Sequence, residues 1–139
     1  MAILKAYLSE LPSGAFAMLA TLLGFVLGLL SGVIVWLWKA YGIRHMLADE
    51  VELNWKAYKK FKAGESWPVR SVYIWQSLQP LITGLLSRSR VKALADFYYL
   101  QAEIYKERES NRPLTLQHAD LLRDTAKNTL EKFGREPSV

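Results

Sequence analysis

The chain has 139 residues, a net charge of +5 from eighteen Lys and Arg against thirteen Asp and Glu, and no cysteine. The absence of cysteine excludes disulfides, thiolate nucleophiles, lipidated cysteines and Cys-ligated metal or iron–sulfur centres. At this length we expect at most one small domain beside any membrane-spanning segment.

Residues 1–14 begin with a short amphipathic pattern. One helical face carries the apolar side chains of Ile3, Leu4, Tyr7, Leu8 and Leu11. A Pro-Ser-Gly sequence at 12–14 then interrupts the helix. We expect this segment to lie on the outer membrane surface. The alternative is that it extends the next helix by three turns.

Residues 15–38 contain no charged side chain and predict a transmembrane helix. At roughly 1.5 Å per residue the run reaches about 36 Å, slightly more than the roughly 30 Å of a bilayer's hydrocarbon core. It is also much longer than the roughly 7–15 apolar residues of a signal peptide, so we expect a retained anchor. The next most apolar stretch, 69–86, is interrupted by polar residues and Pro80, which predicts a single crossing.

Small residues gather on one face of this predicted transmembrane helix. Glycine weakens a helix, so its recurrence at every fourth position suggests that a neighbouring backbone approaches closely there. We therefore expect another transmembrane helix, from a foreign subunit or a second copy, to pack on this face. The predicted packing residues are Ala17, Ala20, Thr21, Gly24, Gly28, Ser31 and Gly32.

The basic residues near the span predict its orientation. Lys5 is the only one upstream, and Glu10 balances it, whereas six lie within two dozen residues downstream: Lys39, Arg44, Lys56, Lys59, Lys60 and Lys62. Basic residues accumulate on the cytoplasmic side, so we expect the N-terminus outside and the C-terminal domain in the cytoplasm of a bacterial-type inner membrane. The expected anchors at the cytoplasmic headgroups are Trp36, Trp38, Lys39, Tyr41 and Arg44.

Residues 39–139 predict an all-α bundle of about four short helices. The inner face of the first runs from 43 to 61, and Gly64 is expected to end the helix. The sequence does not decide whether the chain bends at Gly42 or continues straight from the transmembrane helix. The second covers 69–86, and Pro80 predicts either a kink or two helices that meet at Gln79.

The last two helices have clearer boundaries. Ser87 or Ser89 can cap the third, whose inner stripe is expected to hold Val91, Leu94, Tyr98, Ala102 and Tyr105. Thr115 can cap the fourth, and Gly134 is expected to end it. Its predicted inner face carries Ala119, Leu122, Ala126, Leu130 and Phe133.

Motifs for catalysis or metal binding are weak. His45, Asp49 and Glu52 share one helical face and could hold a divalent metal with His118, but a solvated polar face explains them more simply. Met18 is the only residue of the span that could ligate a metal, and no Gly-x-Ser-x-Gly or phosphate-binding loop is present. We expect no catalytic residues, no metal, no cofactor and no enzymatic activity.

The net positive charge and the aromatic residues suggest different partners. Proximity to an anionic inner leaflet explains the positive charge without a nucleic-acid partner. Trp67, Trp75 and Tyr99 belong to an aromatic set that exceeds what a small bundle is expected to bury, so we expect contacts with a cytoplasmic or membrane protein. The alternative is that they all fill the core.

These patterns favour a non-catalytic, single-pass accessory, assembly or scaffold subunit of a larger membrane complex, such as a respiratory or photosynthetic one. Its predicted parts are an interfacial segment (1–14), a transmembrane helix (15–38) and a cytoplasmic helical domain (39–139). The alternative is a self-associating signalling regulator or a small pore-forming, toxin-like protein.

Overall fold

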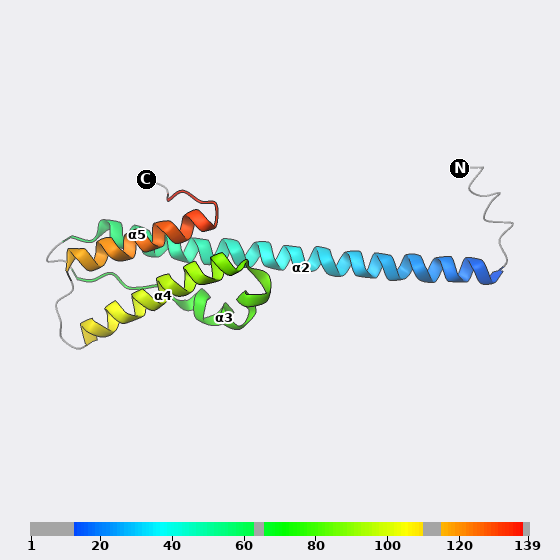
Figure 1. Cartoon of the computed structure of the whole chain (residues 1–139), viewed down its shortest axis with the longest axis horizontal. Helices are drawn as coiled ribbons and strands as arrows, with labels where there is room; N and C mark the ends of the chain where they lie inside the picture. The colour runs from blue at the N-terminus through cyan, green and yellow to red at the C-terminus, as the bar shows by residue number, and fades with distance from the viewer. Residues whose placement is uncertain (1–12, 63–65, 110–114, 138–139) are drawn as a thin grey trace. The chain divides into compact units, whose positions relative to one another are not determined.

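A computed structural model describes residues 13–62, 66–109 and 115–137. These residues form four helices and no strand: α2 (Ser13–Lys60), α3 (Tyr73–Leu85), α4 (Arg88–Glu109) and α5 (Leu116–Lys132) (Figure 1). The expected all-α class, a long apolar helix followed by a helical bundle, is confirmed. The amphipathic helix expected before residue 12 lies outside the described residues. The chain divides into two compact units, Met1–Lys39 and Ala40–Val139.

The first unit contains the N-terminal part of α2. This helix is long and apolar enough to cross a membrane, and no residue of its most apolar window is buried. Large side chains such as Phe25, Leu29 and Trp36 are at least half exposed. Apolar surface of this extent is typical of segments that contact lipid or another protein.

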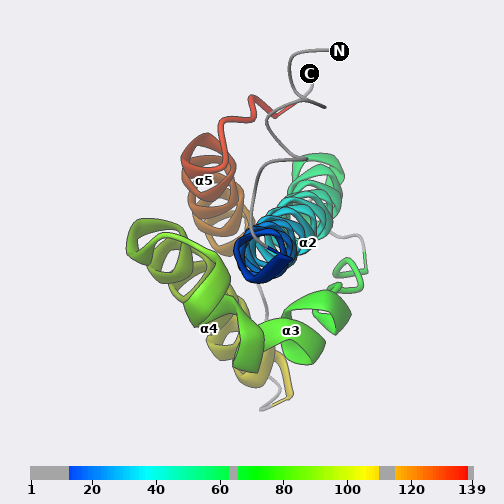
Figure 2. The same ribbon diagram turned by 90° about the vertical axis from the view of Figure 1, so that its right-hand side faces the viewer.

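The second unit is a bundle in which α3, α4 and α5 lie around α2 from Ala40 onward (Figure 2). Its core combines one face of α2 with the inner faces of the other helices. Fully buried members are Leu47, Val51, Ile82, Leu94, Phe97, Leu122, Ala126 and Leu130. Of the inner face predicted for the last helix, four residues are buried and Phe133 is partly buried.

Glu50 places a carboxylate inside this core, with only 2% of its surface exposed. Its Oε1 accepts hydrogen bonds from the Ser71 hydroxyl (3.0 Å) and the Ile74 N–H (2.9 Å). Its Oε2 accepts from the Trp75 N–H (3.0 Å) and the Tyr98 hydroxyl (2.6 Å). Ile74 and Trp75 lie in the first turn of α3, where N–H groups have no partner within the helix. Glu50 therefore caps α3 from a different helix.

Asn54, one turn further along α2, binds the segment that precedes α3. Its amide oxygen accepts from the Ser71 N–H (2.9 Å), and its amide nitrogen donates to the Ser71 carbonyl (2.7 Å) and to the Glu50 carbonyl (3.0 Å). The Ser71 backbone thus bonds to the Asn54 side chain and not within a helix. The predicted start of this helix at residue 69 is therefore wrong, and α3 begins at Tyr73. The preceding helix also ends earlier than Gly64, at Lys60.

Pro80 lies inside α3, so the prediction of two helices that meet at Gln79 is wrong. Proline removes one donor and leaves the carbonyl of Gln76 without its usual partner. The side chains of Gln76, Gln79 and Pro80 are exposed. Water can therefore reach this face of the helix, and the proline is tolerated there.

Of the stripe predicted for α4, Leu94, Tyr98 and Tyr105 are buried and Val91 is partly buried, and the core also takes Phe97, Gln101 and Ile104, which were not predicted. Ala102 is exposed, whereas Gln101 is fully buried and donates a hydrogen bond to the Tyr58 hydroxyl (2.5 Å). The amide nitrogen of Gln101 thus has a partner in the core, whereas its buried amide oxygen has none among the described residues. The predicted boundaries of the last two helices are confirmed: α4 begins directly after Ser87, and Thr115 is the N-cap of α5.

We expect Glu50→Gln to lower the free energy of unfolding of the full chain in detergent by about 2 kcal/mol. A Gln amide nitrogen at the position of Oε2 would face the Trp75 N–H, another donor, and would lose the charge of the acceptor. Denaturant unfolding followed by circular dichroism measures this change.

Glu103→Gln is the matched control, because Glu103 also accepts a tyrosine hydroxyl, that of Tyr99, but on the exposed face of α4. Its effect should stay below about 0.5 kcal/mol. Equal effects of the two substitutions would show that the buried carboxylate does not hold α3.

The domain should lose stability at alkaline pH. Burial, followed by the hydrogen bond to Glu50, raises the pKa of Tyr98, and burial raises the pKa of Tyr58, each above the usual tyrosine value of about 10. The folded state retains both protons above pH 10, where the unfolded chain releases them, so stability is full below that pH and falls above it. Each tyrosine contributes a slope of about 1.4 kcal/mol per pH unit.

A tyrosinate absorbance titration with parallel circular dichroism measures this linkage. The ionisation of Tyr58 and Tyr98 should coincide with unfolding, and Tyr98→Phe should make the loss of stability shallower. Complete ionisation of all seven tyrosines with an unchanged helical signal would contradict the burial of these hydroxyls.

Candidate functional site

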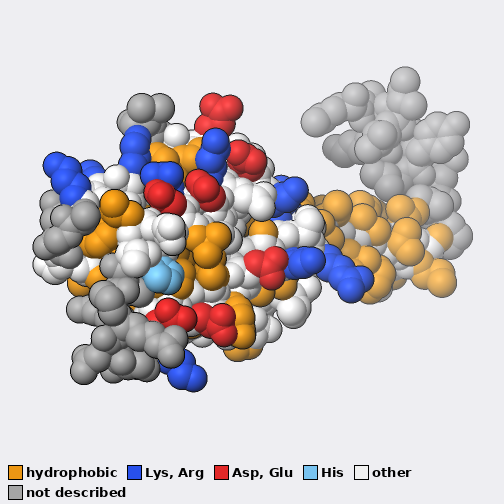
Figure 3. Space-filling model, turned by 60° about the vertical axis from the view of Figure 1, so that its left-hand side comes forward, with side chains coloured by type: hydrophobic (Ala, Val, Ile, Leu, Met, Phe, Trp, Pro, Cys, Tyr) orange, Lys and Arg blue, Asp and Glu red, His pale blue; other side chains and the backbone are white. Residues whose placement is uncertain are grey.

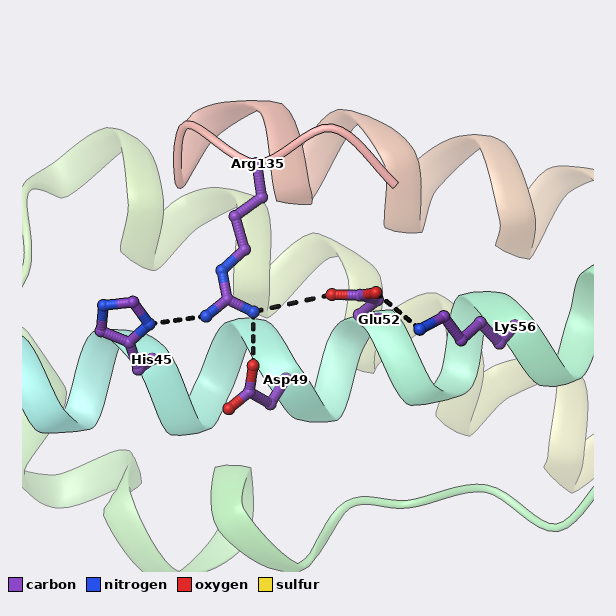
Figure 4. Close-up of polar contacts among 5 residues, drawn as sticks. All are labelled: His45, Asp49, Glu52, Lys56 and Arg135. Atoms are coloured by element: carbon purple, nitrogen blue, oxygen red, sulfur yellow. Dashed lines mark hydrogen bonds and ion pairs between the residues drawn. The ribbon is translucent and has the colours of Figure 1, made fainter. Parts of the chain in front are cut away.

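A polar cluster centred on Arg135 lies on the surface of α2. His45, Asp49, Glu52 and Lys56 follow one face of this helix, and Arg135 reaches them from the segment after α5 (Figure 4). The guanidinium Nη1 donates to Asp49 and lies 3.6 Å from the Glu52 Oε2, while Nη2 lies 2.6 Å from the His45 Nδ1. Glu52 also forms an ion pair with Lys56 (2.7 Å).

The end of α5 explains why Arg135 points toward α2. Gly134 adopts a φ of +72°, the left-handed conformation that favours glycine. Its N–H donates to the Glu131 carbonyl (3.0 Å), and the Arg135 N–H donates to the Leu130 carbonyl (3.1 Å). This pair of bonds is the Schellman motif. The predicted end of the helix at Gly134 is confirmed, and the turn directs Arg135 back across the bundle.

The cluster differs from the metal site considered from the sequence. The guanidinium lies among the three side chains that a metal would need, and the described part of the chain contains no group of three His, Asp or Glu that could hold a metal ion. His118 does not join them: it lies at the start of α5, where the Thr115 N–H donates to its Nδ1 (3.1 Å). Arg135 lies beyond the other end of α5, and the helix between His118 and Lys132 is about 21 Å long.

The three predicted partner contacts have different surroundings. Trp67 is 8% exposed and packs edge-on against Phe61, with ring centroids 4.6 Å apart, which agrees with the alternative of a core position. Trp75 is partly buried and stacks on Tyr98 at 4.8 Å. Tyr99 is 67% exposed, and its hydroxyl donates to Glu103 (2.8 Å). The core absorbs more of the aromatic set than we expected.

The predicted packing residues of the apolar segment are all exposed within their own unit. The Thr21 hydroxyl donates to the Ala17 carbonyl (2.8 Å), and the Ser31 hydroxyl donates to the Gly28 carbonyl (2.9 Å). A Cβ atom added at Gly24, Gly28 or Gly32 would meet no atom within 4 Å. The result is a smooth face whose polar groups are satisfied by the helix itself. The expected anchors Trp36, Trp38, Lys39, Tyr41 and Arg44 are also exposed.

Two important residues were missed from the sequence, Glu50 and Arg135. Glu50 lies between the core residues Leu47 and Val51, so a carboxylate among apolar positions was the available signal. Arg135 follows the predicted helix-ending Gly134, but nothing in the sequence indicates which helix it contacts. Elsewhere on the domain, acidic and basic side chains are interspersed with apolar ones, as Figure 3 shows for one face.

A scan against models of known protein families, a search of curated proteins and a search of solved structures found no match.

Proposed function

We propose that this chain is a non-catalytic, single-pass subunit that helps to assemble or scaffold a larger complex in a bacterial-type inner membrane, such as a respiratory or photosynthetic one. In this proposal α2 crosses the bilayer once and the small-residue face of its apolar part binds a transmembrane helix of a foreign subunit. The domain from Ala40 onward lies in the cytoplasm and contacts a protein partner there.

The observation that carries the proposal is the smooth face of the apolar segment. Gly24, Gly28 and Gly32 leave open space beside the backbone, and the hydroxyls of Thr21 and Ser31 bond to their own helix. In a bilayer, van der Waals contact between closely approaching backbones is a main source of helix association. A face of this kind favours a helix that packs against a partner over a helix that only anchors the chain.

The charge distribution supports the proposed orientation. Lys39, Arg44 and the lysines between 56 and 62 lie on the C-terminal side of the apolar segment. Because such residues are generally retained in the cytoplasm, they favour a domain on that side. Within the domain, Leu53, Tyr73 and Tyr99 remain well exposed and support a protein contact.

Self-association is the second candidate, because the same glycine face could pack against that of a second copy of the chain. A dimeric signalling regulator or a small pore former would then be the functional class. The two candidates differ in what binds to the face.

Gly28→Leu should weaken this association, because the larger side chain holds the neighbouring backbone away. A loss of about 1–2 kcal/mol corresponds to roughly a tenfold lower affinity. Leu29→Ile keeps the side-chain volume at a position about 100° around the helix from Gly28 and should leave the association intact. Blue-native electrophoresis of mild-detergent extracts, with mass spectrometry of the bands, measures both.

A stoichiometric foreign protein that is lost only in Gly28→Leu supports the accessory subunit. Bands that contain only this chain support the self-associating alternative instead. Equal recovery of partners by both variants and the parent chain would show that the small-residue face is not an interface.

A further inference from the structure

A basic cleft opens in the domain close in sequence to the apolar segment. It has a volume of about 120 Å³ and is lined by Tyr41, Arg44, His45, Arg90, Phe133 and Arg135. These residues come from α2, α4 and the turn after α5. Since one water occupies about 30 Å³ in the liquid, the cleft has room for a group of a few heavy atoms, such as a phosphate.

The positive charge of the cleft is only partly compensated. Of the described residues that line it, none is acidic. Asp49 neutralises Arg135 from outside the lining. Arg44 is exposed and has no ion-pair or hydrogen-bond partner among the described residues. Two guanidinium groups, those of Arg44 and Arg90, therefore remain available to an anion.

Neighbouring groups hold the second of these guanidiniums in position. The Arg90 Nε donates to the Lys132 carbonyl (2.9 Å), and the guanidinium lies 5.7 Å from the centre of the Phe133 ring. Its four remaining N–H groups are not used by these contacts. A fixed, planar guanidinium with free donors suits bidentate binding of phosphate oxygens.

Chain connectivity limits how far Tyr41, a residue that lines the cleft, can lie from the end of the apolar segment. Tyr41 follows Trp38 by three residues, which separates their Cα atoms by at most about 11 Å. The headgroup layer on each side of a bilayer is about 5–8 Å thick. Clusters of basic residues directly beside a transmembrane helix attract the headgroups of anionic lipids. Tyr41, whose ring centroid lies 4.3 Å from that of His45, forms the wall of the cleft nearest the segment in sequence.

We propose that this cleft binds the phosphate of an anionic phospholipid, held by Arg44 and Arg90 between the rings of Tyr41 and Phe133. The inference rests on the proposed membrane crossing, which brings lipid headgroups to the cleft. A soluble phosphate ester shares the same chemistry, and the lipid is favoured because the cleft adjoins the apolar segment in sequence.

The test uses the full chain in a neutral detergent, with native mass spectrometry to measure bound ligands. The probes are short-chain phosphatidylglycerol, phosphatidylcholine of the same chain length and glycerol 3-phosphate. Phosphatidylglycerol should bind at least about tenfold more tightly than the other two. Equal binding of glycerol 3-phosphate would overturn the lipid assignment in favour of a soluble phosphate ester.

Arg44→Gln and the double variant Arg44→Gln/Arg90→Gln should each weaken phosphatidylglycerol binding, the double variant by about tenfold or more. Lys92→Gln/Lys127→Gln removes the same charge from exposed positions outside the cleft and should change binding by less than about twofold. The single variant Arg44→Gln keeps the test valid if loss of the Arg90 contacts affects folding. The Arg44 side chain has no ion-pair or hydrogen-bond partner among the described residues, so its removal breaks no such contact.

Equal losses in the cleft and control variants would show that net charge, and not this cleft, binds the lipid. The assay does not depend on any protein partner. A chain that binds phosphatidylglycerol in detergent but is released from membranes by alkaline carbonate would contradict the proposed membrane crossing alone.

Discussion

The buried carboxylate of Glu50 is the interaction on which the domain depends. It receives four hydrogen bonds, two from the first turn of α3, one from the segment before that helix and one from Tyr98 on α4. Helix N-termini favour negative charge, so the start of α3 replaces the cation that a buried carboxylate usually requires. One side chain of α2 thereby positions two other helices.

A second set of contacts joins α5 and the chain after it to the same bundle. The Schellman turn at Gly134 directs Arg135 to α2, and Arg90 on α4 donates to the last carbonyl of α5. Surface contacts of this kind contribute little to stability, about 1 kcal/mol or less for an ion pair such as Arg135–Asp49. Their main consequence is geometric: they bring arginines from different elements to one cleft beside Tyr41 and Arg44.

The parts of the fold that depend on local rules could be predicted from the sequence. The apolar run at 15–38, the Thr115 cap and the Gly134 end follow from side-chain chemistry and backbone preference within a few residues. The start of α3 could not be predicted, because it depends on Asn54, seventeen residues away, pairing with the Ser71 backbone.

The same distinction holds for the candidate site. The shared face of His45, Asp49 and Glu52 follows from helical periodicity, whereas the arrival of Arg135 depends on how α5 packs. For the aromatic residues, the prediction overestimated how many are exposed. Their number suggested an exposed surplus, but the volume between α2 and α4 accommodates Trp67, Tyr98 and Tyr105 in the core.

Amide hydrogen exchange in the full chain tests the role of Glu50 most directly. The N–H groups of Ile74 and Trp75 occupy the first turn of α3, where amides ordinarily exchange fast because they have no partner within the helix. If Glu50 caps α3, both amides should exchange as slowly as those of core residues such as Phe97. Gln117, at the position in α5 that corresponds to Ile74, has no hydrogen-bond partner for its N–H among the described residues and serves as the reference. Exchange of Ile74 and Trp75 as fast as that of Gln117 would contradict the account.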